Sequence, residues 1–153
     1  DRGGKFIQRN SRSAESSLFF IIRPQQPGSQ TKILIQLSTN TYNAYNNWGG
    51  SSLYSYHGRD HLQGHRVSFD RPLAGQFSNW EYPFIAWAEQ NGYQLDYAAN
   101  SDLEFHPEIL QHYKLVLSVG HDEYWSAPMR DHLEQYIKQG GNVAFFSGLF
   151  TIL

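Results

Sequence analysis

Apolar residues gather in short runs along the chain, and polar or turn-forming residues separate one run from the next. The runs with the length and composition of β-strands are residues 18–22, 32–38, 93–98, 114–119 and 142–147. Two of them, 32–38 and 114–119, are almost continuously apolar, which is typical of strands that are covered on both faces. These two runs are therefore predicted to be core strands.

Helical patterns occupy several of the intervals between these strands. Residues 82–90 carry apolar side chains at helical spacing. Residues 101–104 have the form of a capping box, and the Pro that follows favours a helix over 107–112. A further helix is expected to begin after Ser126, a residue type that caps helix N-termini, and to end before Gly140.

Strands and helices thus alternate through the second half of the chain, and this alternation indicates the fold class. Right-handed crossovers at this spacing imply an α/β fold with three layers, in which a mainly parallel sheet lies between helices. Residues 1–17 are polar and Ser-rich and predict an arm or linker in front of a domain over 18–153. Because the chain begins at Asp1 and stops directly after a strand-like run, we expect it to be an incomplete piece of a larger domain.

Composition and charge exclude several classes of function. The formal net charge of −2 argues against nucleic acid as the main partner, because phosphate binding needs a basic face. The longest apolar runs are far shorter than the roughly 20 residues of a membrane-spanning helix, so no membrane partner is expected. The absence of Cys removes disulfides, thiolate nucleophiles and Cys-based zinc sites, and leaves the compartment undecided.

Two polar segments follow the two predicted core strands. Residues 39–79 have few aliphatic pairs and are expected to form a long loop, whose first part, 40–54, is rich in Tyr and Asn. The sequence His121-Asp122-Glu123 follows the strand 114–119. Since the carboxyl ends of parallel strands open onto a crevice, both segments are expected at a binding site.

The residue types of these segments suggest a metal ion. If the two strands are neighbours, phenols and a carboxylate can converge on one point, and a bound cation favours the phenolate form of Tyr. Such oxygen donors suit iron(III) better than zinc. In the alternative interpretation, the aromatic residues pack over the sheet, His121 bonds a carbonyl and the loop histidines His57, His61 and His65 are solvated.

Several separated motifs occur in order along the chain and carry a family resemblance. They are TYNAYNNWGG (41–50), SLY (52–54), VSFDRP (67–72), SVGHDEYW (118–125) and GNVAFFSG (141–148). In these motifs the chain resembles the carboxy-terminal domain of the N,N-dimethylformamidase large (beta) subunit and its relatives, and the resemblance runs from about Leu18 to Gly148. The resemblance implies a domain similar to class I glutamine amidotransferases, with a flavodoxin-like sheet.

The resemblance also implies a mononuclear iron ion held by two tyrosines and one glutamate. It places the ligands on Tyr45, Tyr54 and Glu123, with Tyr42 and Tyr56 as alternates, and an active-site histidine on His121. One departure is Leu149, which stands where relatives generally carry an active-site Asn. Further active-site residues of the family lie downstream of this chain, so the isolated piece is expected to lack part of the site.

The function implied is hydrolysis of the C–N bond of a small linear amide, with iron as Lewis acid and His121 transferring a proton. By the same resemblance, the protein is cytoplasmic and works as a homo-oligomer or with an additional subunit or domain. The competing prediction is a non-catalytic module that binds a small ligand or a partner chain in the same crevice. An enzyme with a nucleophilic Ser is less favoured, because Ser118 and Ser147 lack a Gly-Xaa-Ser-Xaa-Gly elbow.

Overall fold

The computed structural model describes residues 19–72, 75–148 and 151–152, and the elements below belong to these residues. The helices are α1 (Thr39–Tyr45), α2 (Glu81–Gln90), α3 (Asn100–Phe105) and α4 (Ala127–Lys138), with short 3₁₀ helices η1 (Ser55–His57), η2 (Arg59–His61) and η3 (Pro107–His112). The strands are β1 (Ile33–Leu37), β2 (Asp96–Ala99), β3 (Leu115–Gly120), β4 (Tyr124–Trp125), β5 (Asn142–Ser147) and β6 (Thr151–Ile152).

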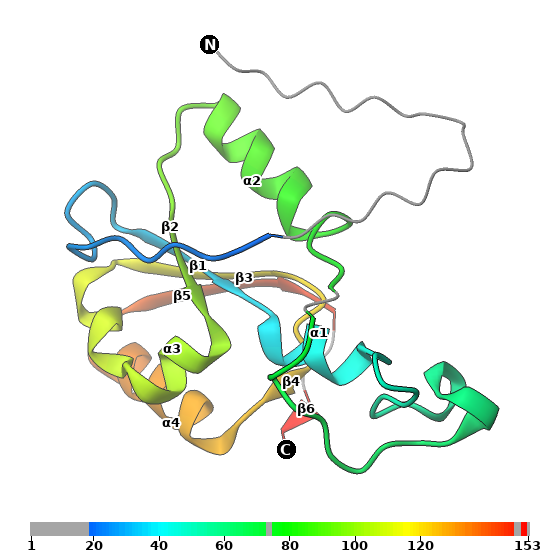
Figure 1. Ribbon diagram of the computed structural model, residues 1–153. Coiled ribbons are helices and arrows are strands. Elements are labelled where there is room, and N and C mark those ends of the chain that lie inside the picture. The colour runs from blue at the N-terminus through cyan, green and yellow to red at the C-terminus, as the bar shows by residue number, and fades with distance from the viewer. Residues whose placement is uncertain (1–18, 73–74, 149–150, 153) are drawn as a thin grey trace.

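A four-stranded parallel sheet forms the centre of the molecule (Figure 1). Its strand order is β2-β1-β3-β5, and β4 pairs with β6 in a separate two-stranded parallel ladder. Figure 1 shows α2 on one side of the sheet and α3 with α4 on the other. The α/β fold class and the mainly parallel sheet between helices are therefore confirmed.

The core consists of two hydrophobic clusters, one on each face of the sheet. Leu34 of β1 and Val116 of β3 point toward α3 and α4, where they pack with buried residues such as Met129. Their neighbours Ile35 and Leu117 point to the opposite face and pack in the cluster that includes Ile85 of α2. Because successive side chains of a strand alternate between faces, the continuous apolar runs predicted for β1 and β3 are what a doubly covered strand requires.

Several local predictions are confirmed. The side chain of Ser126 accepts a hydrogen bond from the backbone N–H of Met129 and caps α4. Residues 107–112 are helical, although as a 3₁₀ helix, and residues 100–105 form a helix of their own. The capping box expected over 101–104 is displaced by two residues: the N-cap of α3 is Ala99, whose N–H donates to the carboxylate of Asp102 over 2.8 Å.

Two local predictions are wrong. Residues 19–22 form no strand: Phe19 and Ile21 pack against the core cluster on the α2 side, whereas Phe20 and Ile22 are exposed, so the extended segment pairs with no sheet neighbour. The loop expected over 39–79 begins instead with α1 and contains η1 and η2. The arm expected over 1–17 lies outside the described residues.

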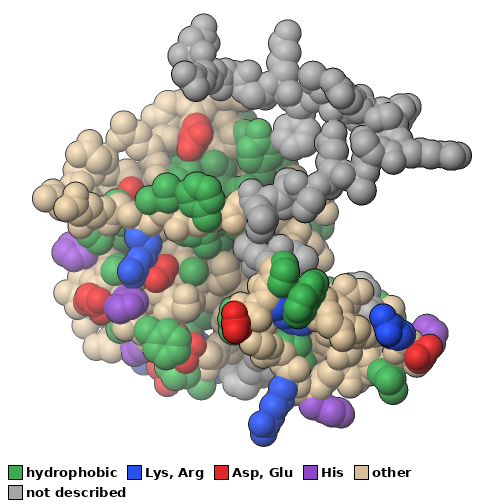
Figure 2. All heavy atoms as spheres, in the orientation of Figure 1, with side chains coloured by type: hydrophobic (Ala, Val, Ile, Leu, Met, Phe, Trp, Pro, Cys, Tyr) green, Lys and Arg blue, Asp and Glu red, His purple; other side chains and the backbone are tan. Residues whose placement is uncertain are grey.

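The described surface is mixed in charge. On the face shown in Figure 2, acidic and basic side chains are interspersed with separate hydrophobic patches. Within the described ranges, no helix is long and apolar enough to cross a bilayer.

Candidate active site

The candidate site lies where the central strands β1 and β3 end side by side. From β1 the chain continues through α1 and α2 to β2 on one side, whereas from β3 it continues through α4 to β5 on the other side. In open α/β sheets, such a reversal between neighbouring parallel strands opens a crevice at their carboxyl ends, where ligands bind. Both polar segments singled out in the sequence follow these two strands.

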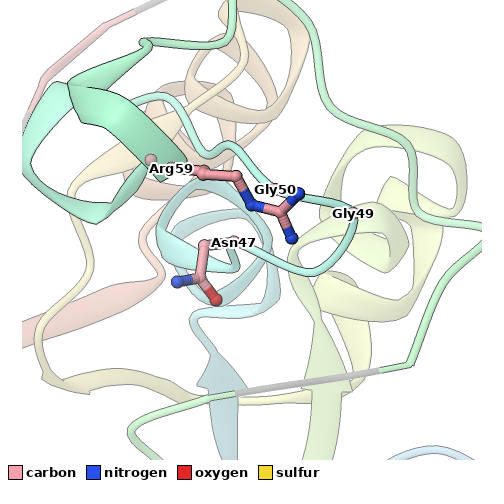
Figure 3. A pocket seen from close by; sticks show the side chains of 5 residues that line it. Asn47, Gly49, Gly50 and Arg59 are labelled. Carbon is pink, nitrogen blue, oxygen red and sulfur yellow. The ribbon is translucent and has the colours of Figure 1, made fainter.

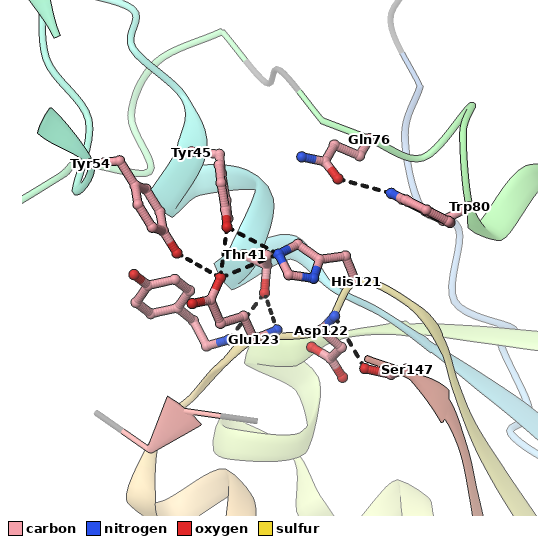
Figure 4. A network of polar contacts seen from close by, with 10 residues as sticks. Thr41, Tyr45, Tyr54, Gln76, Trp80, His121, Asp122, Glu123 and Ser147 are labelled. Carbon is pink, nitrogen blue, oxygen red and sulfur yellow. Dashed lines mark hydrogen bonds and ion pairs between the residues drawn. The ribbon is translucent and has the colours of Figure 1, made fainter. Parts of the chain in front are cut away.

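Three side chains converge on one carboxylate oxygen (Figure 4). Tyr54 Oη donates a hydrogen bond to Glu123 Oε2 over 2.6 Å, and Tyr45 Oη donates to the same oxygen over 2.9 Å. Nε2 of His121 lies 3.2 Å from that oxygen and 3.1 Å from Tyr45 Oη. The structure thus brings together the residues that the sequence selects, while their roles as ligands and proton carrier stay predictions.

The two tyrosines are held side by side by the fold of the segment that follows α1. Tyr45 is the last residue of the helix, and the backbone N–H of Leu53 donates to the carbonyl of Ala44 over 3.0 Å. The hydroxyl of Ser52 accepts the N–H of Tyr54 over 3.1 Å. As a result, the rings of Tyr45 and Tyr54 stack with centroids 4.1 Å apart and an interplanar angle of 24°.

The turn that carries His121 and Glu123 begins at a glycine whose conformation and surroundings exclude other residues. Gly120 has φ +91°, in the left-handed region. A Cβ added to it would lie 2.5 Å from Cβ of Trp80. A side chain here would therefore both strain the backbone and push away the segment that precedes α2.

Asp122 lies between two site residues in the sequence but points into the interior (Figure 4). Its Oδ2 accepts hydrogen bonds from Ser118 Oγ over 2.7 Å and from Gln36 Nε2 over 3.1 Å. Burial raises the pKa of this carboxyl above its ordinary value. Asp122 therefore fastens the turn to β1 and β3 rather than facing the crevice.

The electrostatics of the cluster are those of protonated phenols around one acidic side chain. Burial is the main cause that raises the pKa of Tyr45 and of Tyr54 above their ordinary value of 10, and the hydrogen bonds to Glu123 raise it further. Both phenols consequently act as hydrogen-bond donors to Glu123. A bound cation would instead favour the deprotonated phenolate form of both tyrosines, because positive charge stabilises phenolate.

The two alternate tyrosines differ in position from Tyr45 and Tyr54. Tyr42 is buried, and its hydroxyl donates to Oε1 of Glu81, away from Glu123. Tyr56 is 60% exposed, and its ring lies tilted with its centroid 5.4 Å from that of Tyr54. The geometry therefore favours Tyr45 and Tyr54 as the pair that faces Glu123.

The loop histidines do not form a ligand cluster with one another in what the structure describes. His61 and His65 are exposed, and the side chain of His57 lies outside what the structure describes. Among the described residues, no group of three or more His, Asp or Glu side chains is placed to hold a metal ion. A metal at the candidate site would therefore need the phenol oxygens in its ligand set.

Two hollows lie near the site. A hollow of about 200 Å³ is bounded on one side by α1 and adjoins the cluster, because Tyr45 lines it. It is lined by Thr41, Tyr42, Tyr45, Asn46, Asn47, Gly75 and Gln76. A wider hollow of about 570 Å³ lies over the segment after α1 (Figure 3). It is lined by Asn47, Gly49, Gly50, Gly58 and Arg59.

Comparison with known proteins assigns the family. Residues 5–149 match the family described as N,N-dimethylformamidase beta subunit-like, C-terminal. The chain belongs to this family. It is 30% identical to the N,N-dimethylformamidase beta subunit of Alcaligenes sp. and equally so to that of Paracoccus aminophilus, each over 76% of this chain. The match spans only 18% of each of these relatives.

Within this dimethylformamidase-like domain, sequence reasoning missed two sets of contacts. It did not predict that Tyr42 is paired with Glu81 in the interior, because the spacing of Tyr42 and Tyr45 does not tell which phenol faces the crevice. It also missed Thr41, whose hydroxyl contacts the turn that carries Glu123. A helical assignment of 39–45 would have revealed that Thr41 and Tyr45 share a face.

Proposed function

We propose that this domain holds a mononuclear iron ion on Tyr45, Tyr54 and Glu123 and forms part of an enzyme that hydrolyses a small amide. The observation that carries the proposal is the convergence of two phenol oxygens and an imidazole nitrogen on Oε2 of Glu123, at 2.6 to 3.2 Å. The names of the relatives support the substrate class, because both are beta subunits of N,N-dimethylformamidase.

The donor set fits iron. Two phenol oxygens and a carboxylate are hard oxygen ligands, which suit iron(III), and they lie close enough together to share one ion. Their stacked rings and their hydrogen bonds to Glu123 hold the oxygens in place before any ion binds. When bound, the ion would supply Lewis acidity toward the carbonyl of the amide.

The residues of the chain supply the remaining functions. His121 is placed to move a proton, since its Nε2 is within hydrogen-bond distance of Tyr45 Oη and its side chain is partly exposed to the crevice. The hollow of about 200 Å³ beside Tyr45 is of a size for a small molecule rather than a chain. We assign it to the substrate of the reaction.

The sheet topology agrees with the proposed architecture. Counted along the chain, the four strands of the sheet lie in the order second, first, third, fourth, which is the flavodoxin-like order as far as it extends. In that arrangement the ligand site lies between the first and third strands, as the candidate site does here. This supports a domain related to class I glutamine amidotransferases.

Amide hydrolysis is proposed for the intact protein. The relatives are about five times longer than the matched region, so the catalytic assembly there contains further polypeptide. We propose that the domain works in the cytoplasm with additional protein, either another subunit or another domain. The position of Leu149 lies outside the described residues.

The experiment that tests the function is elemental analysis of the intact protein together with its visible spectrum. We expect bound iron and a charge-transfer band from phenolate to iron. Tyr45→Phe, Tyr54→Phe and Glu123→Ala should each release the iron and with it the band, because each deletes one of the three ligands that the chain supplies. Tyr56→Phe is the matched control and should keep both iron and band. A colourless, metal-free protein that still hydrolyses amides would refute the proposal.

A second candidate function is binding of a small ligand without catalysis. The wider hollow of Figure 3 favours it, because the Asn47 amide and the Arg59 guanidinium offer donors for a carboxylate beside three glycines. A protein without iron that binds a small carboxylate, and loses this binding on Arg59→Ala, would support the second function over the first.

A further inference from the structure

The hydroxyl of Thr41 joins the two segments that make up the candidate site. Its Oγ1 accepts the backbone N–H of Glu123 over 2.9 Å and the backbone N–H of Tyr124 over 3.1 Å. Thr41 is 2% exposed, so water does not readily replace these contacts. Figure 4 shows the hydroxyl between α1 and the turn that follows β3.

Thr41 and Tyr45 lie on the same face of α1, one turn apart. Residues four apart in a helix are neighbours on its surface, so the contact of Thr41 with the turn fixes the helical face from which Tyr45 projects. The backbone N–H that Thr41 accepts belongs to Glu123 itself, whose carboxylate oxygen lies 2.9 Å from Tyr45 Oη. One hydroxyl thus connects the two backbone segments that carry Tyr45 and Glu123.

Other contacts fix each segment separately. The N–H of Asn40 donates to Oδ1 of Asn100 and ties the start of α1 to α3. Asp122 ties the turn to β1 and β3 through Gln36 and Ser118. Neither contact joins α1 to the turn. In the described residues, Tyr45 of α1 contacts the side chains of His121 and Glu123, whereas the hydroxyl of Thr41 contacts the backbone of the turn and so helps to set the distance between the two segments.

Resting on the proposed function, we propose that Thr41 is a positioning residue of the iron site. Its hydroxyl holds the backbone of Glu123 against α1, so that the carboxylate lies within hydrogen-bond distance of the phenol oxygens of Tyr45 and Tyr54. Such sites need their donors held within about 0.5 Å of the productive geometry. Without the hydroxyl, two part-buried N–H groups lose their acceptor and the turn moves to satisfy them.

The test compares Thr41→Val with Thr41→Ser in the intact protein. Val keeps the shape of the side chain and removes the acceptor, whereas Ser keeps the acceptor and removes a methyl group. We expect Thr41→Val to lower the affinity for iron(III) about 10- to 100-fold, as loss of an outer contact of a metal ligand typically does, and to shift the charge-transfer band. Thr41→Ser should restore both.

Tyr113→Phe is the control for a general loss of stability. It removes a hydrogen bond from the buried Tyr113 to Asp96, at the opposite end of the sheet, and should leave iron affinity unchanged. Wild-type affinity in Thr41→Val, or an equal loss in Thr41→Ser or Tyr113→Phe, would overturn the proposal. If Thr41→Val does not fold, Thr41→Ala takes its place, with the same expected order of affinities.

A measurement on the metal-free protein separates this inference from the proposed function. In Thr41→Val, the amides of Glu123 and Tyr124 should exchange faster than in wild type, and the ring resonances of Tyr45 and Tyr54 should shift. If the wild type binds no iron, the proposed function fails, and these resonances still decide whether Thr41 positions the cluster. Unchanged ring resonances in Thr41→Val would contradict the positioning role.

Discussion

Residues of the same type near the site differ in what they contact, and the direction of each side chain explains the difference. Tyr45 faces the acidic side chain of Glu123, whereas Tyr42, three residues earlier on α1, turns inward and donates to Glu81. In the same way, Asp122 points into the interior, whereas Glu123 faces the crevice. Sequence spacing alone does not predict which tyrosine or which acidic residue faces the crevice, because either residue of each pair could form the contacts of the other.

Glu81 is expected to make stability depend on pH. Its carboxyl is fully buried, and burial raises its pKa above the ordinary value of 4.5. Since the folded-state pKa is the higher one, the stabilising contribution is fully present below pH 4.5 and is lost as pH rises through the folded-state pKa. The free energy of unfolding should therefore fall above pH 4.5, by up to about 1.4 kcal/mol per pH unit.

Glu81→Gln should flatten this decline, because the amide keeps an acceptor for Tyr42 and cannot ionise. Chemical denaturation of both proteins from pH 4 to 8 measures the difference. Glu108→Gln, which removes an exposed carboxyl, is the control and should keep the slope of the wild type. Parallel curves for wild type and Glu81→Gln would show that Glu81 does not carry the pH dependence.

At the scale of elements, prediction succeeded where the signal was local. The apolar runs of β1 and β3 and the cap at Ser126 are each contained in a few consecutive residues. The helix α1 has no such signal, because its sequence TNTYNAY holds few strong helix formers. It is stabilised by distant groups, including burial of Tyr42 and the contact of Asn40 with Asn100, which the sequence pattern does not show.

The cap of α4 is expected to contribute measurably to stability. Ser126 Oγ accepts the N–H of Met129 and also donates to Glu104 over 2.8 Å. Ser126→Ala should lower the free energy of unfolding by about 1 kcal/mol, because it leaves an N-terminal N–H of the helix without an acceptor. Urea denaturation measures the change. Ser126→Thr keeps the hydroxyl and should lose much less, and equal losses would assign the effect to packing.

At the scale of the whole molecule, the sequence predicted that two distant segments meet, and the reason was topological. Parallel strands place their carboxyl ends at one edge, so residues 78 positions apart, Tyr45 and Glu123, could be expected in one crevice. That β1 lies directly beside β3 follows from the strand order, which sequence patterns do not contain. The choice of particular ligands came from the family resemblance and not from the periodicity.

The sheet also has an edge strand, β5, that exposes apolar side chains. In the described part of the chain, β5 is the last strand of the sheet on its side, and Phe145 and Phe146 point to opposite faces, both exposed. Parallel sheets normally have both faces covered. An edge strand that exposes apolar side chains is a template for association with another chain.

The chain of 153 residues by itself is therefore expected to self-associate through β5. Sedimentation velocity over a range of concentrations should detect dimers or larger species, and Phe146→Ser should reduce them, because Phe146 is 62% exposed at this edge. Phe105→Ser is the matched control, since Phe105 on α3 is 69% exposed and lies away from the edge. An equal reduction by both variants would mean that general surface hydrophobicity, rather than the edge of the sheet, drives the association.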